Sequence, residues 1–248
     1  MSHTISRTSR MVMLTTLLAA PLSAQLPDAK KIIDQSIAAV GGADAIRKST
    51  SYHLTGKLDA PAQGISGTVE SWNSGGKLLT VIEIPGIGSI RSGYDGTVGW
   101  QIHPAFGANV MTGRQLDQLK QQGDPTAALT PEKYFKSRET VEKTTFDGKE
   151  AYKVKLVLHN GEEYFELYDV TSGLNIGSIR NTESPMGPIE TTSTVVEFKK
   201  FGDLLMPVKI KQGAMGIENI ITISNVDYAA VPATTFELPK EIKALTAK

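Results

Sequence analysis

Residues that could act as catalysts or metal ligands are few in this sequence and widely spaced. His53, His103 and His159 have no second histidine two or four positions away, whereas a zinc site needs three or four ligands. The sequence has no cysteine and none of the motifs HExxH, G-x-S-x-G or GxxxxGK[ST]. Gly86-Ile87-Gly88 begins like a nucleotide-binding loop but lacks the third glycine. We therefore expect no catalytic residue, no metal and no cofactor.

Charged pairs are the other candidates for chemistry, and their positions favour a solvated role. Glu162 and Glu163 follow Asn160-Gly161, a strong hairpin signal, so we expect both carboxylates at an exposed edge. Lys199 and Lys200 are expected at the surface. An accessible cluster of ionisable groups in a cleft would instead favour an enzyme.

Binding of an apolar ligand is the remaining function. Burying one CH₂ group is worth on the order of 0.8 kcal/mol, so a fatty chain could be held without a specific polar contact. Each candidate position fits an ordinary core equally well. The candidates are the apolar residues expected to face inward: Leu54, Val81, Ile90, Trp100, Val154, Leu156, Phe165, Leu167 and Phe198.

The elements that would position these residues are mostly strands. Asp28 is a plausible cap for an amphipathic helix that ends at Gly41-Gly42. From Ser51 the apolar residues recur with period two, and about ten strands follow at short spacing, which predicts a large antiparallel sheet. A sheet of that size must curl, close or stack.

Residues 105–137 interrupt the strand pattern. Met111 to Gln122 is polar and compatible with a helix, and Thr130-Pro131 begins a second short helical piece that runs through Phe135. Such an insertion is typical of a lid, a plug or a packing element. We expect it to lie across the concave side of the sheet, and a surface excursion is an equally good alternative.

The stretch from Thr80 to Pro104 carries a resemblance to a family. It has a strand broken at Pro85, a short second strand, the turn Asp95-Gly96, Trp100 and then a proline. Near the end, Asn225-Val226-Asp227-Tyr228 precedes Phe236-Glu237-Leu238-Pro239. This order, across roughly Asp28 to Ile242, resembles the LolA/LolB-like periplasmic carriers, which are often called outer-membrane lipoprotein-sorting proteins.

The resemblance implies a mainly β (α+β) fold, a curled antiparallel sheet that forms a half-open β-barrel with a helical lid or plug. An apolar inner face that is only partly filled would suit an acyl chain. One position departs from the family. Lipoprotein carriers have an arginine before the proline of the central stretch, whereas Ile84 stands here, and Arg91 lies on the following strand. The departure weakens the inference of a lipoprotein cargo and makes another lipid more plausible.

The N-terminus predicts export. Arg7 and Arg10 precede the apolar run from Met11 to Ala20, and Pro21 to Ala24 resembles a cleavage region. We expect residues 1–24 to be a signal peptide and residues 25–248 to form a single domain in the periplasm. The absence of cysteine excludes an acylated N-terminal cysteine, so we do not expect this chain to be a lipoprotein itself.

Composition limits the partners further. Hydrophobic residues make up 40% of the chain and charged residues 21%, which favours a folded core over disorder. Residues 1–24 hold two of the 26 basic residues and none of the 26 acidic ones, so the remainder has a net charge of −2. That balance does not favour nucleic acid.

Two hypotheses follow. The first is a non-enzymatic carrier that buries the acyl chains of lipoproteins or lipids and delivers them toward an acceptor at the outer membrane. The second is a periplasmic scaffold on the same fold that binds protein without lipid. A contiguous apolar cavity favours the first, and a filled core favours the second.

Overall fold

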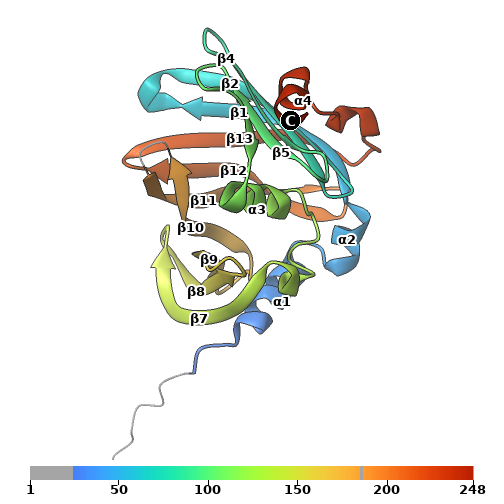
Figure 1. The fold of residues 1–248 in the computed structure, drawn as a ribbon. Coiled ribbons are helices and arrows are strands. Elements are labelled where there is room, and N and C mark those ends of the chain that lie inside the picture. Colours follow the sequence, from blue (N-terminus) through green and yellow to red (C-terminus); the bar gives the residue numbers. More distant parts are fainter. Residues whose placement is uncertain (1–24, 185–186, 248) are drawn as a thin grey trace, which may run out of the picture.

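The computed structural model describes residues 25–184 and 187–247, so the predicted signal peptide lies outside the described residues (Figure 1). Its strands are β1 (Ser51–Ala60), β2 (Ile65–Ser74), β3 (Lys77–Ile84), β4 (Gly88–Tyr94), β5 (Gly99–His103), β6 (Gly107–Met111), β7 (Phe135–Phe146), β8 (Lys149–Leu158), β9 (Glu163–Asp169), β10 (Asn175–Ser184), β11 (Gly187–Phe201), β12 (Leu204–Ala214) and β13 (Ile217–Asp227). Its helices are α1 (Ala29–Ala39), α2 (Ala43–Lys48), η1 (Pro61–Gln63), α3 (Gly113–Gln122), η2 (Pro131–Lys133), η3 (Ala233–Phe236) and α4 (Lys240–Thr246).

All 13 strands form one sheet in the order β6-β5-β4-β3-β2-β1-β13-β12-β11-β10-β9-β8-β7. Each neighbouring pair is antiparallel. The two edge strands, β6 and β7, do not pair with each other, so the sheet curls without closing into a barrel. The predicted curled, half-open antiparallel sheet is confirmed.

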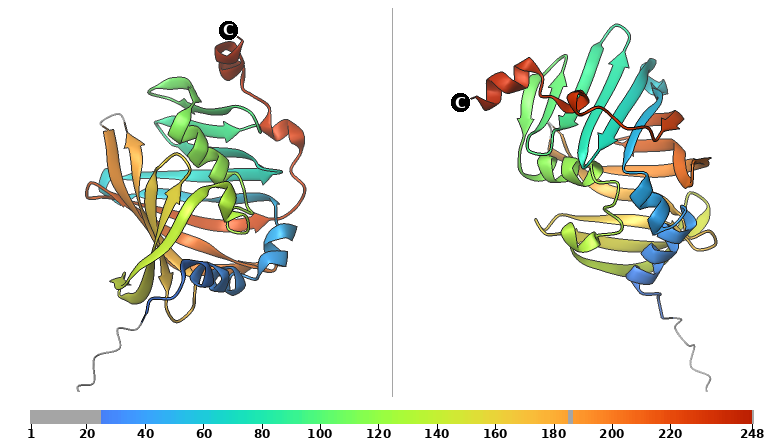
Figure 2. Two further views of the ribbon diagram at one scale, coloured as in Figure 1. Left: turned by 60° about the horizontal axis from the view of Figure 1, so that its bottom comes forward. Right: turned by 90° about the vertical axis from the view of Figure 1, so that its right-hand side faces the viewer.

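The topology explains the path of the helical insertion. Strands β6 and β7 are consecutive in the chain but lie at opposite edges of the sheet. The connection between them, which contains α3, must therefore cross the width of the sheet. Figures 1 and 2 show that α3 lies across the concave side of the sheet. Helix α1 lies on the same side, near β7. The prediction that the insertion lies across the concave side is confirmed.

Helix α1 covers one end of this concave side. The Asp28 side chain accepts a hydrogen bond from the Lys30 backbone N–H and caps the helix. Ile32 and Ile33 pack on Val154 and Leu156 of β8, and all four side chains are buried. Gly41 and Gly42 then end the helix with positive φ angles of 127° and 87°, which residues with a Cβ rarely adopt.

The C-terminal segment packs against the other end of the sheet. Helices η3 and α4, red in Figure 2, contact β3 and β6. Phe236 and Ile242 of this segment are buried, and Glu241 lies 3.7 Å from the Arg91 guanidinium on β4. Within residues 25–184 and 187–247, no helix is long and apolar enough to span a bilayer.

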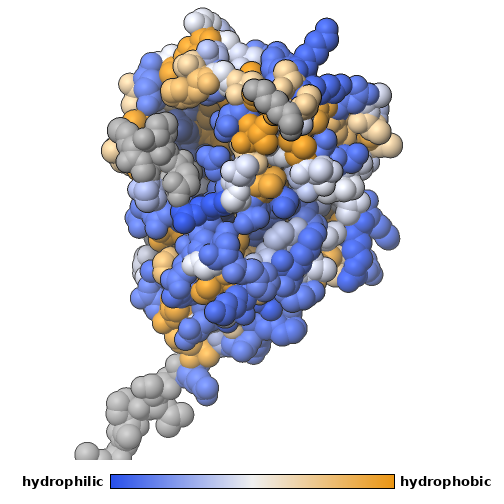
Figure 3. Space-filling view, viewed as in Figure 1, coloured by the Kyte–Doolittle hydropathy of each residue, from blue (hydrophilic) through white to orange (hydrophobic). Residues whose placement is uncertain are grey.

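Both edge strands escaped the sequence prediction of about ten strands. Strand β7 consists mostly of charged and polar residues, and its Glu142 and Lys143 pair with Lys153 and Glu150 of β8 at 3.0 and 2.9 Å. Figure 3 shows the corresponding lower surface as mainly hydrophilic. A charged edge discourages pairing with another chain, and it also lacks the apolar alternation by which strands are recognised.

Candidate functional site

The concave face carries a set of apolar side chains that no helix covers fully. Residues paired directly across antiparallel strands point to the same face, and the pairs Leu58–Ile221 and Ile221–Ile210 extend one row across β1, β13 and β12. Unlike the residues under α1, most of these side chains keep intermediate exposure. We call this set the apolar band; its members are Leu58, Val69, Ile82, Ile90, Val195, Ile210, Ile221 and Ile223.

The opposite face of the same strands is more polar, although Ile220 lies there too. Lys57 pairs with Thr222, and Thr222 pairs with Lys209, which gives a polar row on the convex side. The alternation assigns the apolar face to the interior of the curl. Because these inner side chains remain partly accessible, the concave side offers unfilled apolar surface.

Helix α3 bridges this concave side as a strap. Leu116 and Leu119 pack so closely on β5 that a Cβ added at Gly99 would lie 2.7 Å from Leu116 Cδ1. At the end of α3, Asn73 Nδ2 donates to the Gly123 carbonyl at 2.9 Å, and the Asn73 side chain is fully buried. On the far side, Gln121 Nε2 donates to the Tyr164 hydroxyl of β9 at 3.1 Å. The strap is therefore attached to both arms of the curled sheet.

A second attachment of the strap corrects one prediction. Gln118 Nε2 donates to Glu162 Oε1 at 2.9 Å, and Arg114 Nε lies 3.7 Å from Glu162 Oε2. The Glu162 side chain is only 7% exposed. Glu162 is thus not the solvated edge residue expected from its hairpin, because α3 packs over that turn. Glu163, Lys199 and Lys200 are exposed, as predicted.

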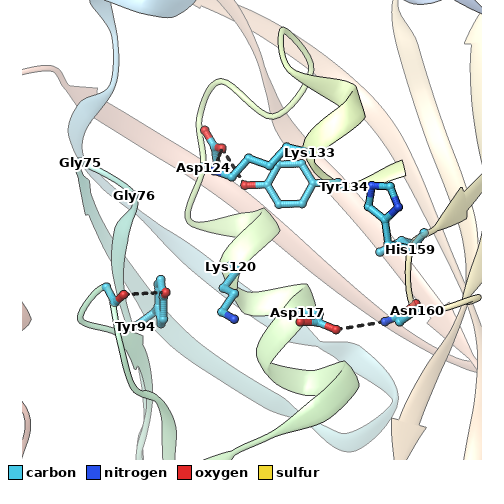
Figure 4. Close-up of a pocket in the computed structure, with 12 residues that line it drawn as sticks. Gly75, Gly76, Tyr94, Asp117, Lys120, Asp124, Lys133, Tyr134, His159 and Asn160 are labelled. Carbon is cyan, nitrogen blue, oxygen red and sulfur yellow. Dashed lines mark hydrogen bonds and ion pairs between the residues drawn. The ribbon is translucent and has the colours of Figure 1, made fainter. Parts of the chain in front are cut away.

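The segment after α3 folds around Asp124. This carboxylate accepts hydrogen bonds from Thr126 N and Oγ1, from Lys133 Nζ at 2.8 Å and from the Tyr134 hydroxyl at 2.7 Å. Partial burial raises the pKa of Asp124, but the bonds from Lys133, Thr126 and Tyr134 outweigh it and hold that pKa well below its usual range. Figure 4 shows Asp124, Lys133 and Tyr134 beside a cavity of about 420 Å³, which Lys120, His159 and Asn160 also line.

A second cavity, of about 270 Å³, lies between this segment and strands β7–β10. Its walls combine apolar residues such as Phe135 and Leu156 with Arg138, Glu166 and Arg180. The Tyr168 hydroxyl donates a hydrogen bond to Glu166, and the Arg180 guanidinium stacks 4.4 Å from the centroid of the Tyr164 ring. Burial raises the pKa of Glu166, and it outweighs the opposing effects of the Tyr168 hydrogen bond and the Arg180 charge.

The nine predicted binding residues do not share one face. Leu54, Ile90, Val154 and Leu156 lie on the concave face, as the pairs Leu54–Ser71, Ile82–Ile90 and Leu156–Tyr164 show. Leu156 lines the second cavity, Val154 is buried beneath α1, and Leu54 and Ile90 are partly exposed. Ligand contact by these four residues stays a prediction.

The other five lie on the convex face, which corrects their expected inward orientation. Val81 pairs with Arg91, and Trp100 packs on Gly93, where an added Cβ would lie 2.7 Å from Trp100 Cζ2. Leu167 and Phe198 belong to a separate cluster with Ala151 and Ile176. Lys153 Nζ lies over the Phe165 ring, 4.5 Å from the ring centroid. Alternation within one strand predicts two faces but does not say which face of the next strand matches.

Other residues of the concave face were not among the predicted binding residues. Ile210 and Ile221 were signalled by the alternation Val208-Lys209-Ile210-Lys211 and by the apolar run of β13. Arg180 and Glu166 had no such signal, because a charged residue in a strand is usually exposed. Arg91, the basic residue nearest Pro85, lies on the convex face beside Glu241. The described residues contain no group of three or more histidine and acidic side chains able to hold a metal ion.

Comparison with solved structures agrees with this architecture. The chain is similar to a LolA superfamily protein from Nitrosomonas europaea, with a TM-score of 0.59 and 12% identity over 86% of this chain and 99% of the other. A DUF1329 family protein from Desulfovibrio piger gives a TM-score of 0.57 at 10% identity, over 84% and 97% of the two chains. A domain described as an outer membrane lipoprotein-sorting protein, from Vibrio parahaemolyticus, gives 0.55 at 13% identity, over 84% and 96%.

These likenesses define the fold. An open, curled antiparallel sheet with helices on its concave side is the LolA-like architecture, and the chain spans nearly the whole length of each of the three structures. The predicted resemblance is confirmed at the level of the fold. No protein-family model matches the sequence, and no curated protein matches it either.

Proposed function

We propose that this protein is a non-enzymatic periplasmic carrier that binds acyl chains of lipids or lipoproteins on its concave face and delivers them toward the outer membrane. The observation that carries the proposal is the apolar band: a row of aliphatic side chains on the inside of the curl that stays partly accessible. Aliphatic surface of this kind is normally covered in a soluble protein, and an acyl chain would complete its burial.

Two further features support the proposal. The strap α3 spans the concave side between the two arms of the sheet, is attached to Asn73 on one arm and to Glu162 and Tyr164 on the other, and is thus placed to act as a lid. The similar structures include a LolA superfamily protein and a domain described as lipoprotein-sorting, at TM-scores above 0.5. Export through a cleaved signal peptide at residues 1–24, and a single domain over residues 25–248, belong to the same proposal.

Neighbouring residues on opposite faces of β13 allow a matched test. Ile221 belongs to the apolar band and Ile220, which pairs with Asp59 and Lys211, points to the convex face. Ile221→Gln should weaken binding of a fluorescent fatty acid by about tenfold, since each CH₂ group of the ligand that is left in water costs on the order of 0.8 kcal/mol. Ile220→Gln should leave the affinity unchanged.

Native mass spectrometry of protein purified from the periplasm provides a second measurement. A bound species that extracts into organic solvent as phospholipid, fatty acid or acylated peptide would identify the cargo class. Ligand-free protein that also takes up no fluorescent fatty acid would overturn the carrier. Equal reductions in affinity for the two isoleucine variants would place the ligand away from the concave face.

A further inference from the structure

The concave face is divided into polar and apolar rows. Next to the row Leu58–Ile221–Ile210–Val195 lies a row of directly paired polar residues. The two rows are two residues apart along each strand, a separation of roughly 7 Å. We call the polar row the polar ladder; it consists of Glu166, Ser178, Ser193, Gln212 and Asn219.

Arg180 lies just beyond the polar ladder on the same face. It is two residues from Ser178 in β10 and pairs with Tyr164, and Tyr164 pairs in turn with Leu156. Its guanidinium is stacked on the Tyr164 ring at the cavity of about 270 Å³ that Arg138 also lines. Two guanidinium groups from different strands thus reach one cavity under the strap.

The charge of Arg180 lacks a direct counterpart. Among the described residues, Arg180 forms no ion pair with a carboxylate, and the nearby Glu166 accepts instead from the Tyr168 hydroxyl. Burial raises the pKa of Glu166, and the Arg180 charge opposes that rise from a distance without forming a direct ion pair. A partly exposed guanidinium that is held by ring stacking and has no direct ion-pair partner suits a carboxylate or a phosphate, which it can bind through two parallel hydrogen bonds.

We propose that Arg180 and the polar ladder bind the anionic head group, carboxylate or phosphate, of an amphiphile whose acyl chain lies on the apolar band. This inference rests on the proposed carrier function and specifies its ligand class. Arg180 supplies the charge, and the hydroxyl and amide groups of Ser178, Ser193 and Gln212 supply hydrogen bonds along the ladder. The protein would then prefer anionic amphiphiles to neutral ones of equal chain length.

Palmitate and hexadecanol provide the test, because they share one acyl chain and differ in charge. Wild-type protein should bind palmitate at least about tenfold more tightly, the order expected for a hydrogen bond to a charged group. Arg180→Gln should lower the affinity for palmitate to that for hexadecanol and leave hexadecanol binding unchanged. Lys209→Gln removes one charge from the convex face of β12 and should change neither affinity.

Further measurements separate this inference from a structural role of Arg180. Arg180→Lys keeps the charge but loses the planar fork, so it should give an intermediate palmitate affinity, and thermal unfolding reports any loss of folding in both variants. Equal weakening of both ligands by Arg180→Gln, or no effect on palmitate, would overturn the head-group site while the carrier stands. Binding of inorganic phosphate as tight as that of lysophosphatidic acid would overturn it in favour of a free-anion site. If wild-type protein binds neither palmitate nor hexadecanol, the carrier and the head-group site both fail.

Discussion

Strands β8 and β12 place nearly the same sequence pattern in two different surroundings. Lys153-Val154-Lys155-Leu156 and Lys209-Ile210-Lys211-Gln212 both alternate lysine with a residue that points to the concave face. In β8 the aliphatic side chains are covered by α1, and Val154 and Leu156 are 0% and 1% exposed. In β12 Ile210 remains partly exposed.

The difference shows what alternation determines and what it leaves open. The period of two decides which side chains share a face, but the element that covers the face is set by the chain's path elsewhere. Helix α1 fills one end of the curl and makes it an ordinary core. Over β11–β13 the aliphatic side chains of the concave face stay partly exposed, and this is the surface to which we propose that a ligand binds.

The largest expected effect compares truncations in these two strands. Leu156→Ala should lower the free energy of unfolding by about 2–5 kcal/mol, because the side chain is almost completely buried in the cluster beneath α1. Ile210→Ala should lower it by only about 1 kcal/mol, because part of that side chain is already in contact with water. Urea denaturation of both variants measures the difference. Equal reductions would mean that Ile210 belongs to a filled core, which would favour a scaffold over a carrier.

Removing one attachment of the strap should have a smaller effect on the free energy of unfolding. Asn73→Ala removes the hydrogen bond to the Gly123 carbonyl from a fully buried site, at an expected loss of about 1–3 kcal/mol. Asn219→Ala changes a partly exposed amide of the polar ladder and should have an effect within about 0.5 kcal/mol. Hydrogen exchange should show faster opening of α3 in the Asn73 variant alone. Unchanged exchange in α3 would show that Leu116 and Leu119 hold the strap without Asn73.

The sequence predicted the interior of the sheet better than its edges or its site. Interior strands alternate clearly, and turns such as Asp95-Gly96 form as expected, with Asp95 Oδ1 accepting from Thr97 and Val98 N–H. The edge strands β6 and β7 lack that alternation because β6 spans only Gly107–Met111 and β7 consists mostly of charged and polar residues. The face to which each predicted site residue points depends on how neighbouring strands are paired. Leu156 is paired with Tyr164 and shares its face, so Phe165, the next residue, points to the opposite face.

Register of this kind is fixed by turns and bulges rather than by the strands themselves. Strand pairing shifts between Thr140 and Glu142 in β7 and between Val195 and Phe198 in β11, and each shift changes which face the next residues occupy. Arg180 is an example of a candidate site residue that could not be predicted from the sequence. The role that we propose for it depends on the Tyr164 ring, with which it pairs across β9 and β10, and on residues of the strap that line the same cavity.

The smallest expected effect concerns residues 124–134, the segment that follows the strap. The charged carboxylate of Asp124 helps to hold this segment together, whereas α1 is held by apolar packing. The pKa of Asp124 is lower in the folded protein than its ordinary value of 3.8, so the ionised carboxylate stabilises the fold fully above that value and progressively less as the pH falls below it. Asp124→Asn should therefore lower the midpoint of thermal unfolding by an amount that is constant from about pH 5 to pH 7 and shrinks below about pH 4. Asp44→Asn, at an exposed position on α2, serves as the control and should show a smaller difference throughout. A difference for Asp124→Asn that persists unchanged into acid would show that hydrogen-bond geometry, rather than charge, holds residues 124–134 together.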